Sequence, residues 1–355
     1  MQYGIAIPTW SDCWKLVKRA EHAGFSTAWF YDTQLLNAEL FAAMGAAAVK
    51  TEKIRLGTGV LIPTNRIAPV SAAGLATLNA LAPGRIDFGV GTGFTGRRTM
   101  GLKAITQASL RDYLRIVQGL LARETVEWDF EGLHRKIRFL NPEAGLVNTT
   151  DPIPLHISAM GPKIRSFTAE LGAGWLNFLI GGQAAALHEA AGMRESWRAA
   201  GRAEGTMSAT AFIAGAVLAQ GEACDSPRAK AQAGPAAAVV LHSLVEGGFD
   251  GSGSASLPPF LSALLQRYRE IYLGYSPADA RYLTLHRGHL MFLRPEEAPL
   301  ITAELIREMT FTATPDVLAE RIRELGRAGY TQIAVQLGPG QEDAIDDWAR
   351  VFELV

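Results

Sequence analysis

The sequence predicts an α/β protein of the (α/β)8 TIM-barrel class. Short apolar runs alternate with longer amphipathic runs along most of the chain, which is typical of strand-helix units around a parallel sheet. The short runs number eight, as many strands as close such a barrel. A doubly wound open sheet is the alternative that the same alternation permits. The expected strands begin near Tyr3, Thr27, Ile54, Ile86, Leu155, Gly174, Ala209 and Gln332.

Helices are expected between these strands, because each parallel strand needs a return connection. The first should cover 11–23, with Ser11 as its N-cap and Gly24 directly after its end. The other expected helices cover 38–49, 70–81, 162–171, 314–328 and 341–354.

Two gaps between expected strands are much longer than one strand-helix unit. We therefore expect insertions after the fourth and seventh strands, at about 94–154 and 220–312. The first should hold a helix at 108–121 and a hairpin that turns at Glu131-Gly132. Long insertions at the carboxyl ends of barrel strands usually build the pocket. The sequence thus predicts a single domain over 1–355 whose two insertions surround a ligand.

Composition narrows the class of protein. The chain has 355 residues, of which 48% are hydrophobic and 19% charged, so it can bury a large core. Its formal net charge of -1 gives no reason to expect nucleic acid or an anionic membrane as a partner. Cys13 and Cys224 are too few for a disulfide framework or a zinc motif, and no metal site is expected. Without a leader or a long apolar run, we expect a cytoplasmic protein.

Two of the expected strands are unusually rich in glycine. The run 54–62 has Gly57, Thr58 and Gly59 at its centre, and 86–93 ends in Gly-Val-Gly-Thr-Gly. Glycine weakens a strand interior unless a bulge or a closely approaching ligand needs the space. The second run lacks the lysine of a P-loop and the spacing of a dinucleotide-binding motif. The pattern indicates a flat ligand against the backbone.

The expected strand ends carry few acids, bases or nucleophiles. No His-x-His pair lies on the first strand, and Lys163 falls after a strand end, so a metal hydrolase and a Schiff-base enzyme are disfavoured. Such a barrel takes its reactivity from an organic cofactor. The segment Ser158-Ala159-Met160-Gly161-Pro162 follows a strand and opens a helix, where N–H groups can hold a phosphate. An ordinary turn is the alternative reading.

Several short motifs follow one another along nearly the whole chain. They are Ala20-Glu21-x-x-Gly24-Phe25, Trp29-x-x-Asp32, Leu56-Gly57-Thr58-Gly59-Val60, Pro63-x-x-Arg66, Pro83-Gly84-Arg85, Gly89-x-Gly91-x-Gly93, Ala159-x-Gly161-Pro162, Gly172-x-Gly174 and Thr314-Pro315-x-x-Leu318. In this order the motifs resemble the bacterial luciferase-like flavin oxidoreductases. The pattern is most similar to the branch that contains methylenetetrahydromethanopterin reductase and the deazaflavin-dependent glucose-6-phosphate dehydrogenases.

The resemblance implies that an isoalloxazine or deazaflavin ring lies across the carboxyl ends of the barrel strands. It also implies a non-proline cis peptide between Gly59 and Val60, where a plain β-bulge is the alternative. The turn after the fifth strand would receive the cofactor phosphate. The residues implied to bind the cofactor are Asp32, Thr58, Gly59, Val60, Gly91, Thr92, Ser158, Ala159, Met160 and Gly161.

One departure from the family pattern bears on the chemistry. Luciferases and relatives that oxidise alcohols have a histidine beside the acidic residue after the second strand, or in its place. This chain reads Tyr31-Asp32-Thr33-Gln34 instead. The usual base for alcohol oxidation is therefore absent at this point, which favours oxygenation, or reduction by a reduced cofactor. Asp32 remains as a candidate catalytic residue.

Other candidates lie further along the chain. His286 and His289 are spaced i, i+3, so on a helix they would share one face and could donate protons to a substrate, although core packing is the alternative. Trp10 and Phe94, after the first and fourth strands, could wall a substrate pocket. Arg97 could meet an acidic substrate or an oligoglutamyl cofactor tail.

These observations favour a flavin-dependent oxidoreductase. The main hypothesis is a monooxygenase that uses reduced FMN and dioxygen on a small organic substrate. The alternative is a coenzyme F420-dependent reductase or dehydrogenase that transfers hydride without oxygen, and the second alternative is a non-catalytic flavin-binding barrel. A cofactor-free lyase or isomerase would need an acid-base pair, for which Asp32 alone is insufficient. Expected partners are the substrate, a separate reductase that supplies the cofactor, and a second copy in a homodimer.

Overall fold

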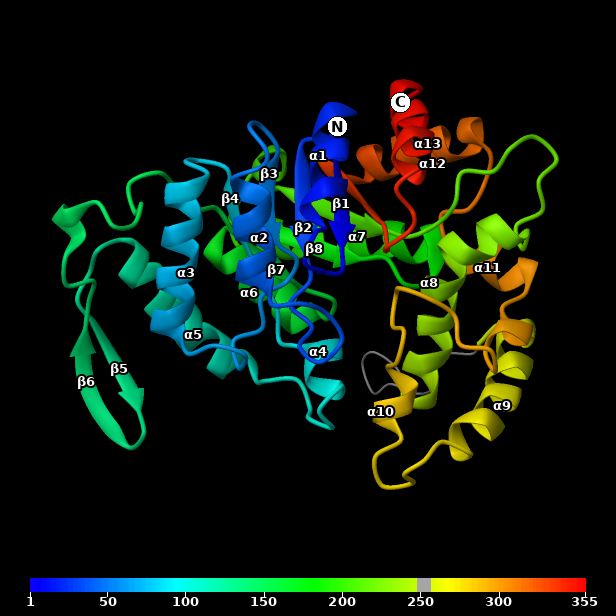
Figure 1. Ribbon diagram of the computed structural model, residues 1–355, viewed down its shortest axis with the longest axis horizontal. Coiled ribbons are helices and arrows are strands. Elements are labelled where there is room, and N and C mark those ends of the chain that lie inside the picture. The colour runs from blue at the N-terminus through cyan, green and yellow to red at the C-terminus, as the bar shows by residue number, and fades with distance from the viewer. Residues whose placement is uncertain (248–256) are drawn as a thin grey trace.

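The centre of the molecule is a closed barrel of eight parallel strands (Figure 1). The computed structural model describes residues 1–247 and 257–355. Around the barrel the order is β1-β10-β9-β8-β7-β4-β3-β2, which confirms the predicted fold class and excludes the open sheet. Each expected strand start lies within one residue of an observed one. The strands are β1 (Gln2–Ile7), β2 (Thr27–Phe30), β3 (Arg55–Thr58), β4 (Ile86–Val90), β7 (Leu155–Ser158), β8 (Gly174–Phe178), β9 (Ala209–Ile213) and β10 (Gln332–Gln336).

Helices return the chain between these strands and cover the outside of the barrel (Figure 1). They are α1 (Trp14–His22), α2 (Leu40–Ala48), α3 (Ala68–Leu81), α6 (Pro162–Leu171), α7 (Gly182–Ala199), α12 (Pro315–Ala328) and α13 (Ala344–Glu353). The prediction of Ser11 as an N-cap is wrong, because the chain forms a turn there and α1 starts after Cys13, without a side-chain cap. Gly172 and Gly329 end α6 and α12 in the left-handed conformation, with φ of 65° and 110°.

The segment between β4 and β7 falls where the first insertion is expected. It contains α4 (Phe94–Arg98), α5 (Gln107–Leu121), the strands β5 (Val126–Phe130) and β6 (Leu133–Ile137), and the short η1 (Pro142–Ala144). The antiparallel hairpin β5–β6 projects from the barrel in Figure 1. Its two-residue turn is Glu131-Gly132, with φ of 52° and 75°, as the sequence predicts.

The segment between β9 and α12 builds a helical layer beside the barrel mouth (Figure 1). It contains α8 (Pro227–Val245), α9 (Pro259–Leu273), α10 (Tyr282–Leu285), η3 (Ala298–Leu300) and α11 (Ala303–Met309), and the short η2 (Glu204–Thr206) lies before β9. These helices share a hydrophobic core of their own, in which Leu241, Leu261 and Leu305 are fully or almost fully buried. The layer therefore holds its shape by packing as well as by its attachment to the barrel.

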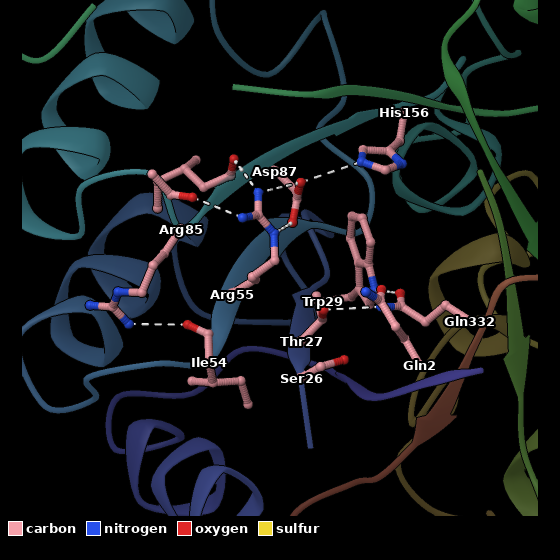
Figure 2. Close-up of polar contacts among 12 residues, drawn as sticks. Gln2, Ser26, Thr27, Trp29, Ile54, Arg55, Arg85, Asp87, His156 and Gln332 are labelled. Carbon is pink, nitrogen blue, oxygen red and sulfur yellow. Dashed lines mark hydrogen bonds and ion pairs between the residues drawn. The ribbon is translucent and has the colours of Figure 1, made fainter. Parts of the chain in front are cut away.

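Bulky and polar side chains fill the barrel interior (Figure 2). The Trp29 indole donates to Gln332 Oε1 at 2.9 Å, and Asp87 accepts two 2.8 Å hydrogen bonds from Arg55 and lies 3.4 Å from His156 Nε2. A side chain at Gly57 would overlap the Trp29 indole. The glycine within β3 therefore gives space to Trp29, a neighbour in the fold, and not to a ligand.

Among residues 1–247 and 257–355, no helix is long and apolar enough to cross a membrane. Cys13 and Cys224 are both free.

Candidate active site

A cavity at the carboxyl ends of the barrel strands has a volume of about 330 Å³. This is within the usual range for small-molecule sites, which begins at roughly 300 Å³. The ends of β2, β3, β4, β7, β8, β9 and β10 line it, together with α8 and the segment after α10. The predicted site residues that line it are Asp32, Gly59, Val60, Gly91, Thr92, Phe94, Ser158, Met160, Gly161 and His289.

Five other predicted residues do not line this cavity. Thr58 is fully buried and donates its hydroxyl to the Gly89 carbonyl at 2.6 Å. The buried Ala159 offers its carbonyl to the Trp175 indole. Trp10 packs against the main core, and Arg97 donates to Thr64 and to the Lys103 carbonyl. His286 lies behind the cavity and is described below.

Glycine shapes the cavity floor. A Cβ on Gly91 would lie 2.8 Å from Val60 Cγ2 and 3.4 Å from Ser158 Cβ, between two residues that line the cavity. A Cβ on Gly59 would instead point down, to 2.9 Å from Trp29 Cβ. The Gly59–Val60 peptide bond is cis, as the family resemblance implies. The floor is thus bare main chain at Gly59 and Gly91, and a planar ring can lie against it.

The turn between β7 and α6 is suited to an anion. Gly161 is the N-cap of α6 and has φ of -96°, and a Cβ built there would meet nothing within 4 Å. The first turn of an α-helix leaves N–H groups without intrahelical partners, and the helix dipole favours negative charge there. Arg165 donates to the Met160 carbonyl at 2.7 Å, which brings a guanidinium next to the turn. A phosphate at Gly161 would meet both the amides and this positive charge.

Asp32 is held by two donors. Its Oδ2 accepts from Arg66 Nη1 at 2.9 Å and from the Ile62 N–H at 3.0 Å. Burial raises the pKa of the Asp32 carboxyl above its usual value, although Arg66 opposes this shift. The residue borders the cavity, but one of its oxygens is committed to fixing the segment after β3.

Aromatic side chains form one wall of the cavity. Phe178 and Phe212 stack with their ring centroids 4.3 Å apart, and Tyr31 lies 6.2 Å from Phe178. Sequence reasoning missed Phe212 and Gln336 as site residues, although both occur in the last residues of strands β9 and β10 and could have been found there. No lysine or arginine is among the described lining residues. The walls therefore favour an uncharged ligand portion.

The two candidate histidines are not on one helix, so that prediction is wrong. The helix α10 ends at Leu285, and both residues follow it. Their rings nevertheless approach each other, with centroids 5.9 Å apart. His289 lines the cavity, with Nε2 at 3.4 Å from Thr95 Oγ1. His286 is almost fully buried, with Nε2 at 3.3 Å from Glu246 Oε1.

A third histidine completes this buried group. His242 on α8 lies with its ring centroid 6.4 Å from that of His289 and forms a hydrogen bond to Glu297. His242 and Arg294 hold the pKa of the Glu297 carboxyl down to about 2, against the effect of burial, and Tyr268 also donates to Glu297. The sequence gives no sign of this arrangement, because Glu297 lies 55 positions from His242.

Comparisons with known proteins place the chain in a family. The model of the luciferase-like monooxygenase family matches residues 2–332, so the chain belongs to this family and is a luciferase-like oxidoreductase. It is 28% identical to 5,10-methylenetetrahydromethanopterin reductase of Archaeoglobus fulgidus over 337 residues, 93% of this chain and 91% of the relative.

Two solved structures illustrate the fold. The coenzyme F420-dependent tetrahydromethanopterin reductase of Methanopyrus kandleri is similar with a TM-score of 0.67 at 21% identity, over 98% of this chain and 97% of that one. The oxygenating constituent of 3,6-diketocamphane monooxygenase from Pseudomonas putida, in complex with FMN, has a TM-score of 0.59 at 14% identity, over 100% and 96% of the two chains. At these identities both likenesses concern the fold alone.

Proposed function

We propose that the protein is a coenzyme F420-dependent oxidoreductase that transfers hydride to or from a small organic molecule. The observation that carries this proposal is the similarity over nearly the full length to a methylenetetrahydromethanopterin reductase. F420-dependent glucose-6-phosphate dehydrogenases are also among the relatives, at 32% identity over 47% of the chain for that of Kineococcus radiotolerans. This pattern favours the deazaflavin alternative over the reduced-FMN monooxygenase that the sequence put first.

The residues of the cavity fit such a cofactor. The bare main chain at Gly59 and Gly91 would carry the ring, and the turn at Gly161 would hold the phosphate. When bound, a deazaflavin supplies or accepts a hydride. Asp32 positions the segment after β3 through the Ile62 N–H, and Phe178 and Phe212 exclude water from the reacting face.

The proposal also includes a separate reductase that regenerates the reduced cofactor, and a homodimer. The outer helices α2 and α3 support the homodimer. They pack side by side and contain no charged residue, with Ala42, Val70 and Thr77 exposed. Exposed apolar faces of this kind mark contact surfaces. A second copy of the same face would cover it without burying an unpaired charge.

An anaerobic titration of the purified chain tests the cofactor assignment. Coenzyme F420 and FMN, each oxidised and reduced, are added separately, and binding is followed by cofactor absorbance and fluorescence. We expect F420 to bind at least tenfold more tightly than FMN. Tighter binding of FMN would support the monooxygenase hypothesis instead. A spectral change without consumption of reduced cofactor, whatever substrate is added, would support the non-catalytic barrel.

A further inference from the structure

Tyr31 points into the barrel from the end of β2. Its N–H donates to the Ile7 carbonyl at 3.0 Å, so the residue continues the pairing of β1 with β2. Side chains along a strand alternate between the two faces of the sheet. Ala28 and Phe30 pack in the main core outside the strands, whereas Trp29 and Tyr31 belong to a separate cluster inside the barrel. Tyr31 therefore lies above Trp29 and lines the cavity.

The hydroxyl of Tyr31 makes no hydrogen bond to another described residue, and burial is the one influence on its pKa. Only 7% of the residue is exposed. Buried polar groups nearly always have a partner, so a free hydroxyl at this place calls for an explanation. Its oxygen is not among the described side-chain atoms that the protein encloses completely without a partner. The hydroxyl therefore stays open to the cavity, where a bound molecule can reach it.

The Tyr31 phenol can act as a donor but not as a base. Burial raises the pKa of Tyr31 far above its usual value, so the hydroxyl keeps its proton near pH 7. A neutral phenol donates one hydrogen bond. Loss of its proton would leave a buried phenolate, and no cationic side chain is among the described lining residues. Tyr31 thus suits a reaction in which a substrate oxygen gains negative charge without taking the phenol proton.

The surroundings of the hydroxyl suit a flat, uncharged molecule. The Tyr31 ring centroid lies 6.2 Å from that of Phe178, which stacks on Phe212 with centroids 4.3 Å apart. All three side chains line the cavity. Aromatic faces pack well against other flat π systems. An anionic group would find no lysine or arginine among the described lining residues, so the structure favours a neutral, conjugated substrate at this wall.

We propose that Tyr31 donates a hydrogen bond to the carbonyl oxygen of a conjugated carbonyl compound, an enone, whose C=C bond is reduced. This inference rests on the proposed function, which supplies the hydride. Reduction of an isolated carbonyl group produces an alkoxide, which must take a proton on oxygen at once. Reduction of an enone produces an enolate instead, whose charge is shared between oxygen and carbon. A hydrogen bond from a phenol that keeps its proton is sufficient to stabilise this enolate.

The bond changes balance. The substrate gains a hydride at its β-carbon, and the new C–H bond takes the electron pair of the C–H bond that breaks in the reduced deazaflavin. The C=C π pair moves to the bond between the α-carbon and the carbonyl carbon, and the C=O π pair moves to the oxygen that Tyr31 contacts. The α-carbon then takes a proton from water and the C=O bond forms again. The cofactor loses two electrons and releases one proton to water, so one C=C bond is reduced for each cofactor oxidised.

The product formed by the wild type tests the substrate class. Purified protein is incubated anaerobically with reduced F420 and cyclohexenone, in which the C=C bond is conjugated to the C=O bond, and the products are separated by gas chromatography. We expect cyclohexanone. Formation of cyclohexenol, or no turnover by wild-type protein that binds F420, would overturn the inference. Failure of the wild type to bind F420 would overturn the proposed function instead.

A matched pair of variants tests the residue. Tyr31→Phe removes the hydroxyl and keeps the ring. Tyr113→Phe removes a buried hydroxyl that donates to Ser71 between α5 and α3, away from the cavity lining. We expect Tyr31→Phe to lose at least about 100-fold in kcat with cyclohexenone, as for removal of an oxyanion donor, with the Kd for F420 changed by less than about threefold. Tyr113→Phe should keep the wild-type kcat. Equal kcat in Tyr31→Phe and the wild type would overturn the inference.

Infrared spectroscopy gives a second readout that needs no turnover. Cyclohexenone labelled with carbon-13 at the carbonyl group is bound to the protein together with oxidised F420, which cannot donate a hydride. A hydrogen bond to the carbonyl oxygen weakens the C=O bond, so we expect a lower stretching frequency in the wild type and in Tyr113→Phe than in Tyr31→Phe. A loss of packing alone would not produce this difference. The same frequency in all three proteins would overturn the inference.

Discussion

Asp32 and Arg66 tie the end of β2 to the segment after β3, with Oδ2 and Nη1 2.9 Å apart. Only 4% of the Asp32 side chain and 13% of the Arg66 side chain are exposed. Arg66 also pairs with Glu39. Asp32, at the edge of the cavity, therefore holds the main chain after β3 in place. An experiment can distinguish this structural role from the role of a catalytic base.

The first prediction concerns this pair. Asp32→Asn should lower the free energy of unfolding by about 3 kcal/mol, because it leaves a nearly buried guanidinium short of a partner. The pH at which the rate of hydride transfer changes should not move. Urea denaturation and stopped-flow kinetics measure the two effects. Asp12→Asn is the control, because the ion pair between Asp12 and Lys15 is exposed to solvent and should contribute little to stability. Lost turnover at unchanged stability would make Asp32 a catalytic residue.

The second prediction concerns the anion-binding turn. Gly161→Ala should weaken F420 binding at least tenfold while leaving the melting temperature unchanged. The backbone at Gly161 suits any residue and its surroundings are empty, so the added methyl group takes space only from the phosphate. Gly205→Ala is the matched control, since its Cβ would also meet nothing within 4 Å and the residue lies in η2, away from the cavity. Equal F420 affinity in the wild type and both variants would show that the phosphate does not bind at this turn.

The third prediction concerns the polar layer inside the barrel. Burial alone would raise the pKa of Asp87, but hydrogen bonds from His156 and Arg55 outweigh it and lower the pKa. The ionised carboxylate therefore stabilises the fold above its usual pKa near 3.8, and this stabilisation is lost as pH falls through the lower, folded-state value.

Asp87→Asn should accordingly cost about 3 to 5 kcal/mol of unfolding free energy at pH 7 and flatten the acid limb of the stability curve. Denaturation at a series of pH values measures both effects. Asp129→Asn, in the exposed hairpin, is the control. If the unfolding free energy of Asp87→Asn still falls at low pH as it does in the wild type, other carboxylates cause this fall.

The fourth prediction concerns the uncharged face of α2 and α3. Thr77→Glu places a charge on this face, at an exposed position of α3, and should convert a dimer into monomers, because the charge would be buried without a partner. Light scattering after size-exclusion chromatography measures the mass. Ala199→Glu, at the exposed end of α7, should leave the mass unchanged. A wild-type monomer, or a dimer in the Thr77→Glu variant, would contradict the proposed interface.

The strands of the barrel could be predicted because each is a local apolar run, and the strand ends then follow. The reason for each glycine could not be predicted. Gly57 leaves space for the Trp29 indole and Gly91 leaves the cavity floor bare, but each is followed by Thr-Gly in the sequence. Contacts between residues that lie far apart in the sequence could not be predicted either. The Leu290 carbonyl, next to His289, accepts from Gln336, 46 positions away, and His242 forms a hydrogen bond with Glu297, 55 positions away. The insertions bring such residues together through the packing of helices on one another. Hydrophobic periodicity predicts that a helix forms, but not which residues of two helices meet.

The buried Trp29 side chain, whose Cβ lies beneath Gly59 and whose indole packs against Gly57, closes the barrel below the cavity floor. A ligand therefore reaches this floor only from the carboxyl ends of the strands. A cofactor that lies flat on the floor is then covered by the substrate that binds after it. Turnover should then follow a compulsory sequence, in which the cofactor enters before the substrate and leaves after the product. Excess substrate would bind above the used cofactor and slow its release. We therefore expect inhibition at high substrate concentration, as a consequence of the barrel being closed by Trp29.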